Sequence, residues 1–259
     1  DFNSTEENHI FNRHQMNIVY ENSIGEKGFS EFFTTNDEAN TLSVNYKKKY
    51  KNALYPDKAH LGQYSGKFLN ICNIIKKSKG IVVIYSGYLW SGVVPIAACL
   101  EHMGFSREGT NNILKNPEII DNPPQYGSNK HPKYCILTSD QKEIMGNTNI
   151  DKLIKIINSP ENSDGSQIKV VFVTPVAGEG LSFYNVREMH IVDPWFNKNR
   201  LEQIIGRGIR NCRHQSLPLE ERNVTVFMHA SYDNDDYETA DITAYRIASK
   251  KLTQMKQVE

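Results

Sequence analysis

The sequence has few cysteines, no long hydrophobic run and no excess of charge of either sign. No apolar run reaches the roughly 18 residues that a membrane-spanning helix needs, so the sequence predicts no membrane partner. The N-terminus is polar and lacks the apolar segment of a secretory signal peptide, which favours a protein that is not secreted. Four scattered cysteines without a CxxC pair predict reduced thiols, as in a cytosolic or nuclear compartment.

Charge and size set further limits. Lys and Arg together number 30, as do Asp and Glu, so the chain lacks the strongly basic character of an obligate nucleic-acid binder. A motor that moves along a backbone needs only a local groove, so the balance does not exclude such a partner. The 259 residues, 39% of them hydrophobic and 23% charged, suit one globular domain with or without an appendage.

The hydrophobic pattern alternates between strands and helices. Short β-branched runs such as Ile81 to Tyr85 are apolar at every position, which is typical of strands buried on both faces of a parallel sheet. Similar runs and the helical patterns between them predict an α/β fold, with an open, mainly parallel sheet and helices on both faces. We expect further strands at residues 134–138, 170–173, 189–192 and 224–228, and helices at residues 68–79, 93–103, 150–157 and 201–210.

The domain limits follow from where this pattern begins and ends. Residues 66–230 are predicted to form the α/β domain. Residues 1–65 are predicted to be an N-terminal extension that packs on it or links it to another domain, and residues 231–259 a helical C-terminal extension. The Asn-, Gly- and Pro-rich residues 105–132 interrupt the alternation and predict a mobile surface loop.

Two segments carry the chemistry. The helix pattern from Gln203 to Arg210 places Arg207 and Arg210 three residues apart on one face, where fixed guanidinium groups can offset charge that develops on a phosphate. The Gly-rich residues 174–182 directly follow a buried strand, at the end of a parallel sheet where ligands bind. Each segment alone is also compatible with a plain surface helix or an ordinary turn, so their combination is what matters.

In order and spacing these segments resemble the motifs of superfamily 2 helicases. Tyr85-Ser86-Gly87-Tyr88 resembles motif IV, residues 174–182 resemble motif V, and residues 203–210 fit the QxxGRxxR pattern of motif VI. The combination AGEGLSF…VREMHIVDPWFN…RLEQIIGRGIR is similar to the helicases of the poxvirus nucleoside triphosphate phosphohydrolase I and early transcription factor type, found in large DNA viruses. The resemblance covers about residues 66–230 and implies a RecA-like helicase C-terminal domain.

The resemblance also implies roles at the nucleotide. Arg207 and Arg210 match the arginine fingers that reach across to ATP, and Gln203 matches the motif VI glutamine beside them. Glu179 and Gly180 match the end of motif V that faces the nucleotide ribose and the interface between lobes.

The remaining implied roles concern partners. Thr174 of motif V and Ser86 of motif IV match positions near the nucleic-acid backbone, so DNA or RNA is the expected partner. The family further implies viral transcription or genome handling, with the transcription machinery as an expected partner and a cytoplasmic or virion location. The sequence leaves two alternatives open. One is a non-catalytic module with a helicase-like lobe that binds nucleic acid or acts as a scaffold in a transcription complex, and the other is a translocase that moves on duplex DNA without separating it.

The sequence contains no nucleotide-binding first lobe. The phosphate-binding pattern GxxxxGK[ST] does not occur, and Gly66-Lys67 is followed by Phe68. We therefore expect ATP and Mg²⁺ to be held mainly by an N-terminal RecA-like lobe outside this sequence, and this chain alone not to hydrolyse ATP.

Other polar residues are interpreted structurally. Asp193 is expected to shape a turn, Trp195 to pack, and His190 to be a core histidine. Cys99 with His102, and His131 with Cys135, have spacings that zinc ligands can have, but one pair lies in a helix pattern and the other beside a loop, so no metal site is predicted.

Overall fold

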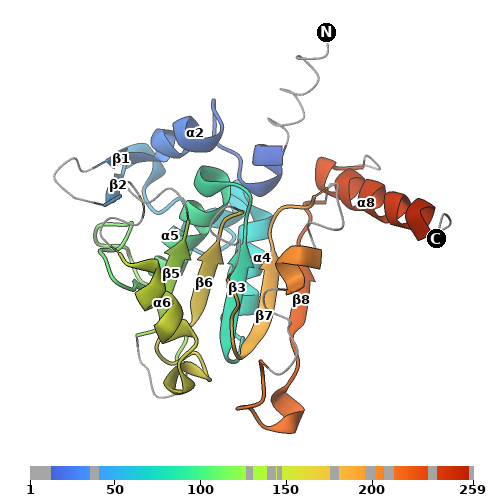
Figure 1. The fold of residues 1–259 in the computed structure, drawn as a ribbon. Helices are drawn as coiled ribbons and strands as arrows, with labels where there is room; N and C mark the ends of the chain where they lie inside the picture. Colours follow the sequence, from blue (N-terminus) through green and yellow to red (C-terminus); the bar gives the residue numbers. More distant parts are fainter. Residues whose placement is uncertain are drawn as a thin grey trace.

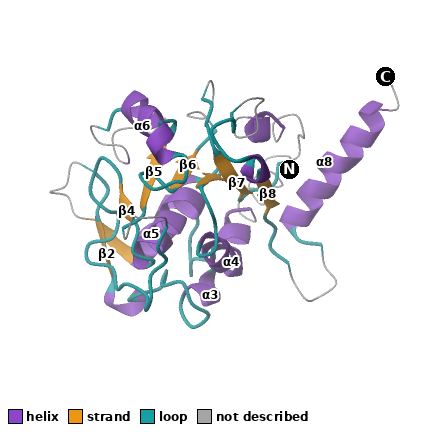
Figure 2. Ribbon diagram, turned by 90° about the horizontal axis from the view of Figure 1, so that it is seen from below, coloured by secondary structure: helices purple, strands orange, loops and turns teal. Residues whose placement is uncertain are grey.

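A parallel sheet forms the centre of the fold. The computed structural model describes residues 13–35, 41–126, 131–138, 144, 148–175, 181–195, 202–206, 213–232 and 238–256. Six strands lie in the order β4-β5-β6-β3-β7-β8, and every pairing is parallel (Figures 1 and 2). The strands are β3 (Ile81–Tyr85), β4 (Ser106–Arg107), β5 (Lys133–Leu137), β6 (Val170–Val173), β7 (Val186–Ile191) and β8 (Thr225–Met228). The predicted α/β class with an open parallel sheet is confirmed.

Helices cover both faces of this sheet. Figure 2 shows α4 (Gly66–Ile75) and α5 (Val94–His102) on one side and α6 (Ile150–Ile157) on the other. Side chains alternate along the central strand, so Val82 and Ile84 join the α4 and α5 side, whereas Ile81 and Val83 join the α6 side. This arrangement explains why β3 is apolar at every position.

Local sequence signals define where these helices begin. Ser65 caps α4 by accepting a hydrogen bond from the Phe68 amide, and Asn149 caps α6 through the Lys152 amide. Between β3 and α5 lies the π-helical segment η2 (Leu89–Val93), which is kinked at Ser91. Short 3-10 turns occupy η1 (Lys48–Tyr50), η4 (Pro160–Asn162) and η5 (Leu219–Glu221).

The described part of the N-terminal region packs on the α4 and α5 side of the sheet. Its aromatic residues Phe29 and Phe32 are buried in the same hydrophobic cluster as Phe68 of α4. Its elements are α2 (Gly25–Phe32), β1 (Phe33–Thr35), β2 (Val44–Tyr46) and α3 (Leu61–Tyr64), with β1 and β2 antiparallel.

The expectation of a surface loop at residues 105–132 is wrong at residues 106–107 and 113–114, whereas most residues from 115 to 125 are exposed. Ile113 and Leu114 are buried at 0% and 3% exposure, and Ser106–Arg107 add the edge strand β4 to the sheet. The Glu101 side chain of α5 binds the backbone of this segment, because it accepts hydrogen bonds from the amides of Ile113 and Leu114.

At the other end of the described chain, α8 (Ala240–Lys256) begins against the sheet and then projects away from it (Figures 1 and 2). Its first turns are seated by Asp241, Ala244 and Ala248, which are buried. Within the described ranges, no helix combines the length and hydropathy that crossing a bilayer requires.

Candidate functional site

Motifs IV and V meet at the carboxyl edge of the sheet. Ser86 follows β3 and Thr174 follows the neighbouring strand β6, and the Ser86 amide donates to the Val173 carbonyl at 3.3 Å. Ser86 is fully buried and Thr174 is 7% exposed. The structure therefore brings together the two residues that the sequence assigns to a nucleic-acid contact.

Asp193 fixes the conformation of the motif IV loop, residues 85–88. Its Oδ2 accepts hydrogen bonds from the Ser86 hydroxyl at 2.7 Å and from the Gly87 amide at 2.5 Å, while its Oδ1 accepts one from the Asn17 side chain. Burial raises the pKa of the Asp193 carboxyl, although hydrogen bonds from Asn17 and Ser86 oppose that effect. Asp193 thus shapes a turn, as the sequence suggested, and the Ser86 hydroxyl points inward to it.

A cavity of about 290 Å³ lies beside this loop. It is lined by Tyr85, Gly87 and Tyr88 of the loop, together with Pro175 and Trp195. The Arg13 guanidinium also lines it and lies 5.7 Å from the centre of the Trp195 ring. The N-terminal region therefore forms one wall of the candidate site, although this region shows only faint resemblance to helicases.

The described start of motif VI lies on the α6 side of the sheet, opposite the side that α4 and α5 cover. Residues 202–206 are helical, with Ile204 buried against the α6 side of the sheet and Gln203 exposed. The remaining predicted nucleotide-site residues, Glu179, Gly180, Arg207 and Arg210, lie outside the described residues.

His190, His229 and His102 make hydrogen bonds within the protein. His190 is fully buried, as expected of a core histidine, and its Nδ1 lies 2.9 Å from Nε2 of His229. His102 shares a hydrogen bond with the Tyr46 hydroxyl at 2.8 Å and another with the Glu118 carbonyl at 2.6 Å. In the part of the chain that the structure describes, no group of three or more His, Cys, Asp or Glu side chains could hold a metal ion.

Three polar residues near the site escaped the sequence analysis. Asn17 contacts Asp193, Lys67 contacts Asn17, and Asp241 of α8 contacts Lys67. Only Lys67 stands at a position that the sequence marks, because it follows the Ser65 cap and Gly66 in the first turn of α4. Its partners lie about 50 and 174 residues away along the chain, so no local pattern connects them.

Gly92 is required by the close approach of η2 to the motif IV loop. A Cβ atom at this position would lie 2.1 Å from the Ser86 Oγ. We expect Gly92→Ala to lower the free energy of unfolding by about 1–3 kcal/mol and to displace Ser86 from Asp193. Urea unfolding measures the loss. Gly66→Ala is the control, since nothing lies within 4 Å of a Cβ there, and an equal loss in both variants would contradict the steric argument.

Comparison with known proteins agrees with the resemblance to helicases. Residues 133–212 match the family model of the helicase conserved C-terminal domain. The chain is 31% identical over 221 residues to a protein of Acanthamoeba polyphaga mimivirus named "Putative ATP-dependent RNA helicase", covering 85% of this chain and 32% of that protein. It is 30% identical over 239 residues to nucleoside triphosphatase I of Heliothis armigera entomopoxvirus, covering 87% of this chain and 32% of that protein.

A third relative is the termination factor NPH-I homolog of African swine fever virus, 29% identical over 214 residues and covering 74% of this chain and 30% of that protein. The chain thus spans about a third of the length of these curated relatives. Among solved structures, the C-terminal part of the Fun30 ATPase domain overlaps 80% of this chain and 57% of that chain, with 13% identity and a TM-score of 0.38. That overlap is too loose to support a functional statement.

Proposed function

Because the chain carries a helicase conserved C-terminal domain, we propose that it is the second motor lobe of an ATP-dependent nucleic-acid helicase or translocase. The observation that carries the proposal is the meeting of motifs IV and V at one edge of a parallel sheet, where Ser86 and Thr174 follow adjacent strands. Ligands of open α/β sheets bind at the carboxyl ends of the strands.

At the nucleotide, the chain would contribute positively charged arginine side chains and not a phosphate-binding loop. Arg207 and Arg210 are proposed as arginine fingers, with Gln203 beside them and with Glu179 and Gly180 facing the ribose. The sequence contains no GxxxxGK[ST] loop, so ATP and Mg²⁺ would be held mainly by a first RecA-like lobe.

At the nucleic acid, the motif IV loop and the start of motif V would track the backbone. Since the Ser86 hydroxyl is directed to Asp193, we propose that Ser86 acts by fixing the exposed Gly87 and the partly exposed Tyr88, which would face the strand. Thr174, 7% exposed, would line the same groove.

The biological setting is proposed from the relatives. One is named a termination factor homolog and another a nucleoside triphosphatase, and both come from viruses. We propose that the whole protein works in viral transcription or genome handling, on DNA or RNA, and contacts the transcription machinery there.

The first test is ATP turnover by this chain, with and without single-stranded and double-stranded DNA. We expect no turnover under any of these conditions, because the phosphate-binding lobe is not part of the sequence. Turnover stimulated by DNA would overturn the assignment of this chain to the second lobe alone. Salt dependence of DNA binding is measured in parallel, since tight, steeply salt-sensitive binding by this chain would favour the scaffold alternative.

A further inference from the structure

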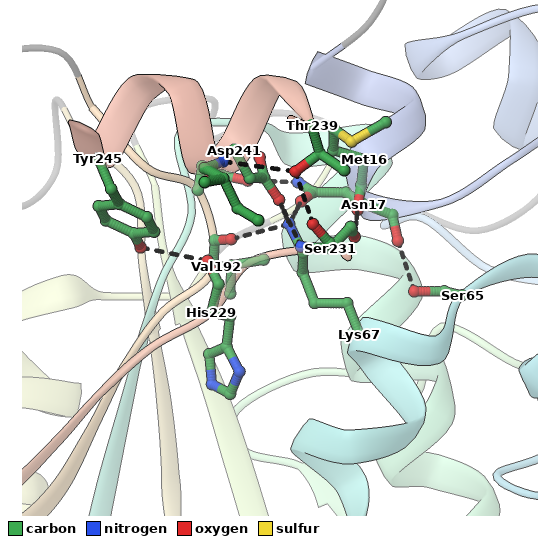
Figure 3. A network of polar contacts seen from close by, with 12 residues as sticks. Met16, Asn17, Ser65, Lys67, Val192, His229, Ser231, Thr239, Asp241 and Tyr245 are labelled. Atoms are coloured by element: carbon green, nitrogen blue, oxygen red, sulfur yellow. Dashed lines mark hydrogen bonds and ion pairs between the residues drawn. The ribbon is translucent and has the colours of Figure 1, made fainter. Parts of the chain in front are cut away.

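α8 is joined to the sheet edge by a buried ion pair. The Lys67 Nζ lies 2.5 Å from the Asp241 Oδ2, and the two side chains are 2% and 3% exposed. Figure 3 shows the ammonium group of Lys67 between Asp241 and Asn17. Lys67 also donates to Asn17 Oδ1 at 2.9 Å and to the Val192 carbonyl at 3.3 Å, so all three of its protons have acceptors.

Asn17 extends this pair to the motif IV loop. Its Oδ1 accepts from Lys67, and its Nδ2 donates to Asp193 Oδ1. The other oxygen of Asp193 accepts from the Ser86 hydroxyl and the Gly87 amide. Asp241, Lys67, Asn17 and Asp193 therefore form one unbroken relay from the first turn of α8 to the loop that would face nucleic acid.

The surrounding contacts restrict each member of the relay to one position. Asp241 Oδ2 also accepts from the Ser231 amide at 2.9 Å, and the Ser231 hydroxyl donates to the Met16 carbonyl at 2.5 Å (Figure 3). The Ser65 hydroxyl that caps α4 donates to the Asn17 carbonyl at 2.5 Å. Buried and fully bonded polar networks of this kind hold one arrangement rather than several, because each lost partner leaves a buried group unsatisfied.

The relay links segments that are far apart in the sequence. It joins the helical residues 13–17, the start of α4, the turn after β7 and the start of α8. A helix that only covered apolar surface would not need a charge under its first turn. Asp241 places a carboxylate there at the cost of desolvation, which the ammonium of Lys67 offsets.

From this geometry we propose that Asn17, Lys67 and Asp241 are positioning residues that fix the motif IV loop, so that the seating of α8 sets how residues 86–88 are presented to nucleic acid. The nucleic-acid half of this statement rests on the function proposed above. The positioning half does not, because it concerns contacts within this chain. A partner or domain movement that displaced α8 would thereby loosen the loop.

The test is amide hydrogen exchange of this chain, followed by NMR at the Gly87 amide, which donates to Asp193. The variant is Lys67→Met with Asp241→Asn, which removes both charges together and leaves an acceptor for the Ser231 amide. Removing both leaves neither member of the ion pair as an uncompensated charge, and Asp193 keeps its hydrogen bonds from Ser86 and Gly87, so the variant is expected to fold. We expect Gly87 to exchange roughly 10-fold faster or more, while Val82, whose amide donates to Lys169 in the sheet, keeps its rate.

Two control variants affect α8 without touching the relay. Tyr245→Phe removes the hydrogen bond from α8 to the His229 carbonyl, and Arg246→Gln breaks the exposed pair with Glu238. Neither should change exchange at Gly87. Asn17→Leu, which keeps the ion pair but removes the middle link, should reproduce the faster exchange and serves as the second variant if the double variant unfolds.

Binding of a mixed-sequence single-stranded DNA at low salt gives the functional readout. We expect the relay variants to bind roughly 5-fold more weakly or worse than the controls, as the loss of one ordered contact would produce. An unchanged Gly87 rate, or an equal acceleration at Gly87 and Val82, overturns the positioning role. Faster exchange at Gly87 with no DNA binding by any variant, including the parent chain, upholds the positioning role and counts instead against the proposed nucleic-acid groove.

Discussion

Replacing Arg207 with alanine in the full-length protein is expected to lower ATP turnover about 10³-fold or more. Phosphoryl transfer spreads negative charge over the oxygens of the transferred group, and a guanidinium held near them stabilises that charge only if it is fixed in place. The described start of motif VI, residues 202–206, is helical, and Ile204 packs on the α6 side of the sheet.

Steady-state turnover at saturating ATP and nucleic acid measures this effect. Arg207→Lys should recover little activity, since a lysine lacks the planar fork of the guanidinium. Arg213→Ala is the matched control, because the Arg213 guanidinium lies over the Tyr184 ring at 4.2 Å and is engaged within this chain. Turnover within a few-fold of normal for Arg207→Ala would refute the finger assignment, and a loss as large for Arg213→Ala would indicate general damage to this region.

The core of the fold was predictable because its strands carry their own signal. Residues 81–85 and 170–173 are apolar at every position, and the structure buries every one of these residues in the sheet. Parallel strands that are covered on both faces have no solvent-facing positions, so their sequences are continuous hydrophobic runs. The strands at 134–138, 189–192 and 224–228 were placed to within about three residues by the same reasoning.

What the sequence did not reveal depends on distant contacts. β4 has only two residues and a polar sequence, so its pairing with β5 leaves no periodic pattern. The composition of the Asn- and Pro-rich segment before β5 predicts a mobile loop. In the structure, however, Ile113 and Leu114 are buried, and their amides donate hydrogen bonds to Glu101. Hydrogen bonds from a helix side chain to a remote backbone cannot be inferred from local composition.

The candidate site also has a part that the sequence predicted and a part that it did not. Motif order and spacing pointed to Ser86 and Thr174, which the structure places on adjacent strands. The same motifs could not show that the Ser86 hydroxyl is taken up by Asp193, or that Asn17 completes that contact from 176 residues away. The motifs point to the residues of the candidate site, whereas the residues that hold them in place come from segments far away in the sequence.

Replacing Glu101, a buried residue that supports a distant segment, should cause a large loss of stability. The side chain is fully buried on α5, and its Oε1 accepts from the Ile113 amide at 2.7 Å and the Tyr134 hydroxyl at 2.5 Å. Its Oε2 accepts from the Leu114 amide at 2.6 Å. Glu101→Ala would leave these three buried donors without an acceptor, which we expect to lower the free energy of unfolding by about 3–5 kcal/mol.

Urea unfolding of purified variants measures this loss. Tyr134→Phe removes only one of the three donors and leaves the carboxylate in place, so it should cost about 1 kcal/mol. A loss below about 1 kcal/mol for Glu101→Ala would show that water or a rearranged segment satisfies the freed amides. It would then follow that residues 113 and 114 are not held by this carboxylate.

The same carboxyl group should give the chain a distinct pH dependence. Burial raises the pKa of Glu101 to about 7, although the hydrogen bonds from Tyr134, Leu114 and Ile113 act in the opposite direction. The folded state then holds this proton more tightly than the unfolded state, whose glutamate titrates at about 4.5. Stability from this group is therefore complete below pH 4.5 and is lost as the pH rises through about 7, by about 3 kcal/mol in all.

Glu101→Gln separates this titration from all others in the chain, since glutamine cannot ionise. The variant loses one of the two acceptor oxygens and should be less stable than the parent at pH 5. The difference in unfolding free energy between parent and variant should shrink by a few kcal/mol between pH 5 and pH 7.5, because only the parent carries the cost of a buried charge at the higher pH. A difference that stayed constant with pH would mean that Glu101 is already ionised at pH 5, and that its three donors stabilise the carboxylate more than burial opposes it.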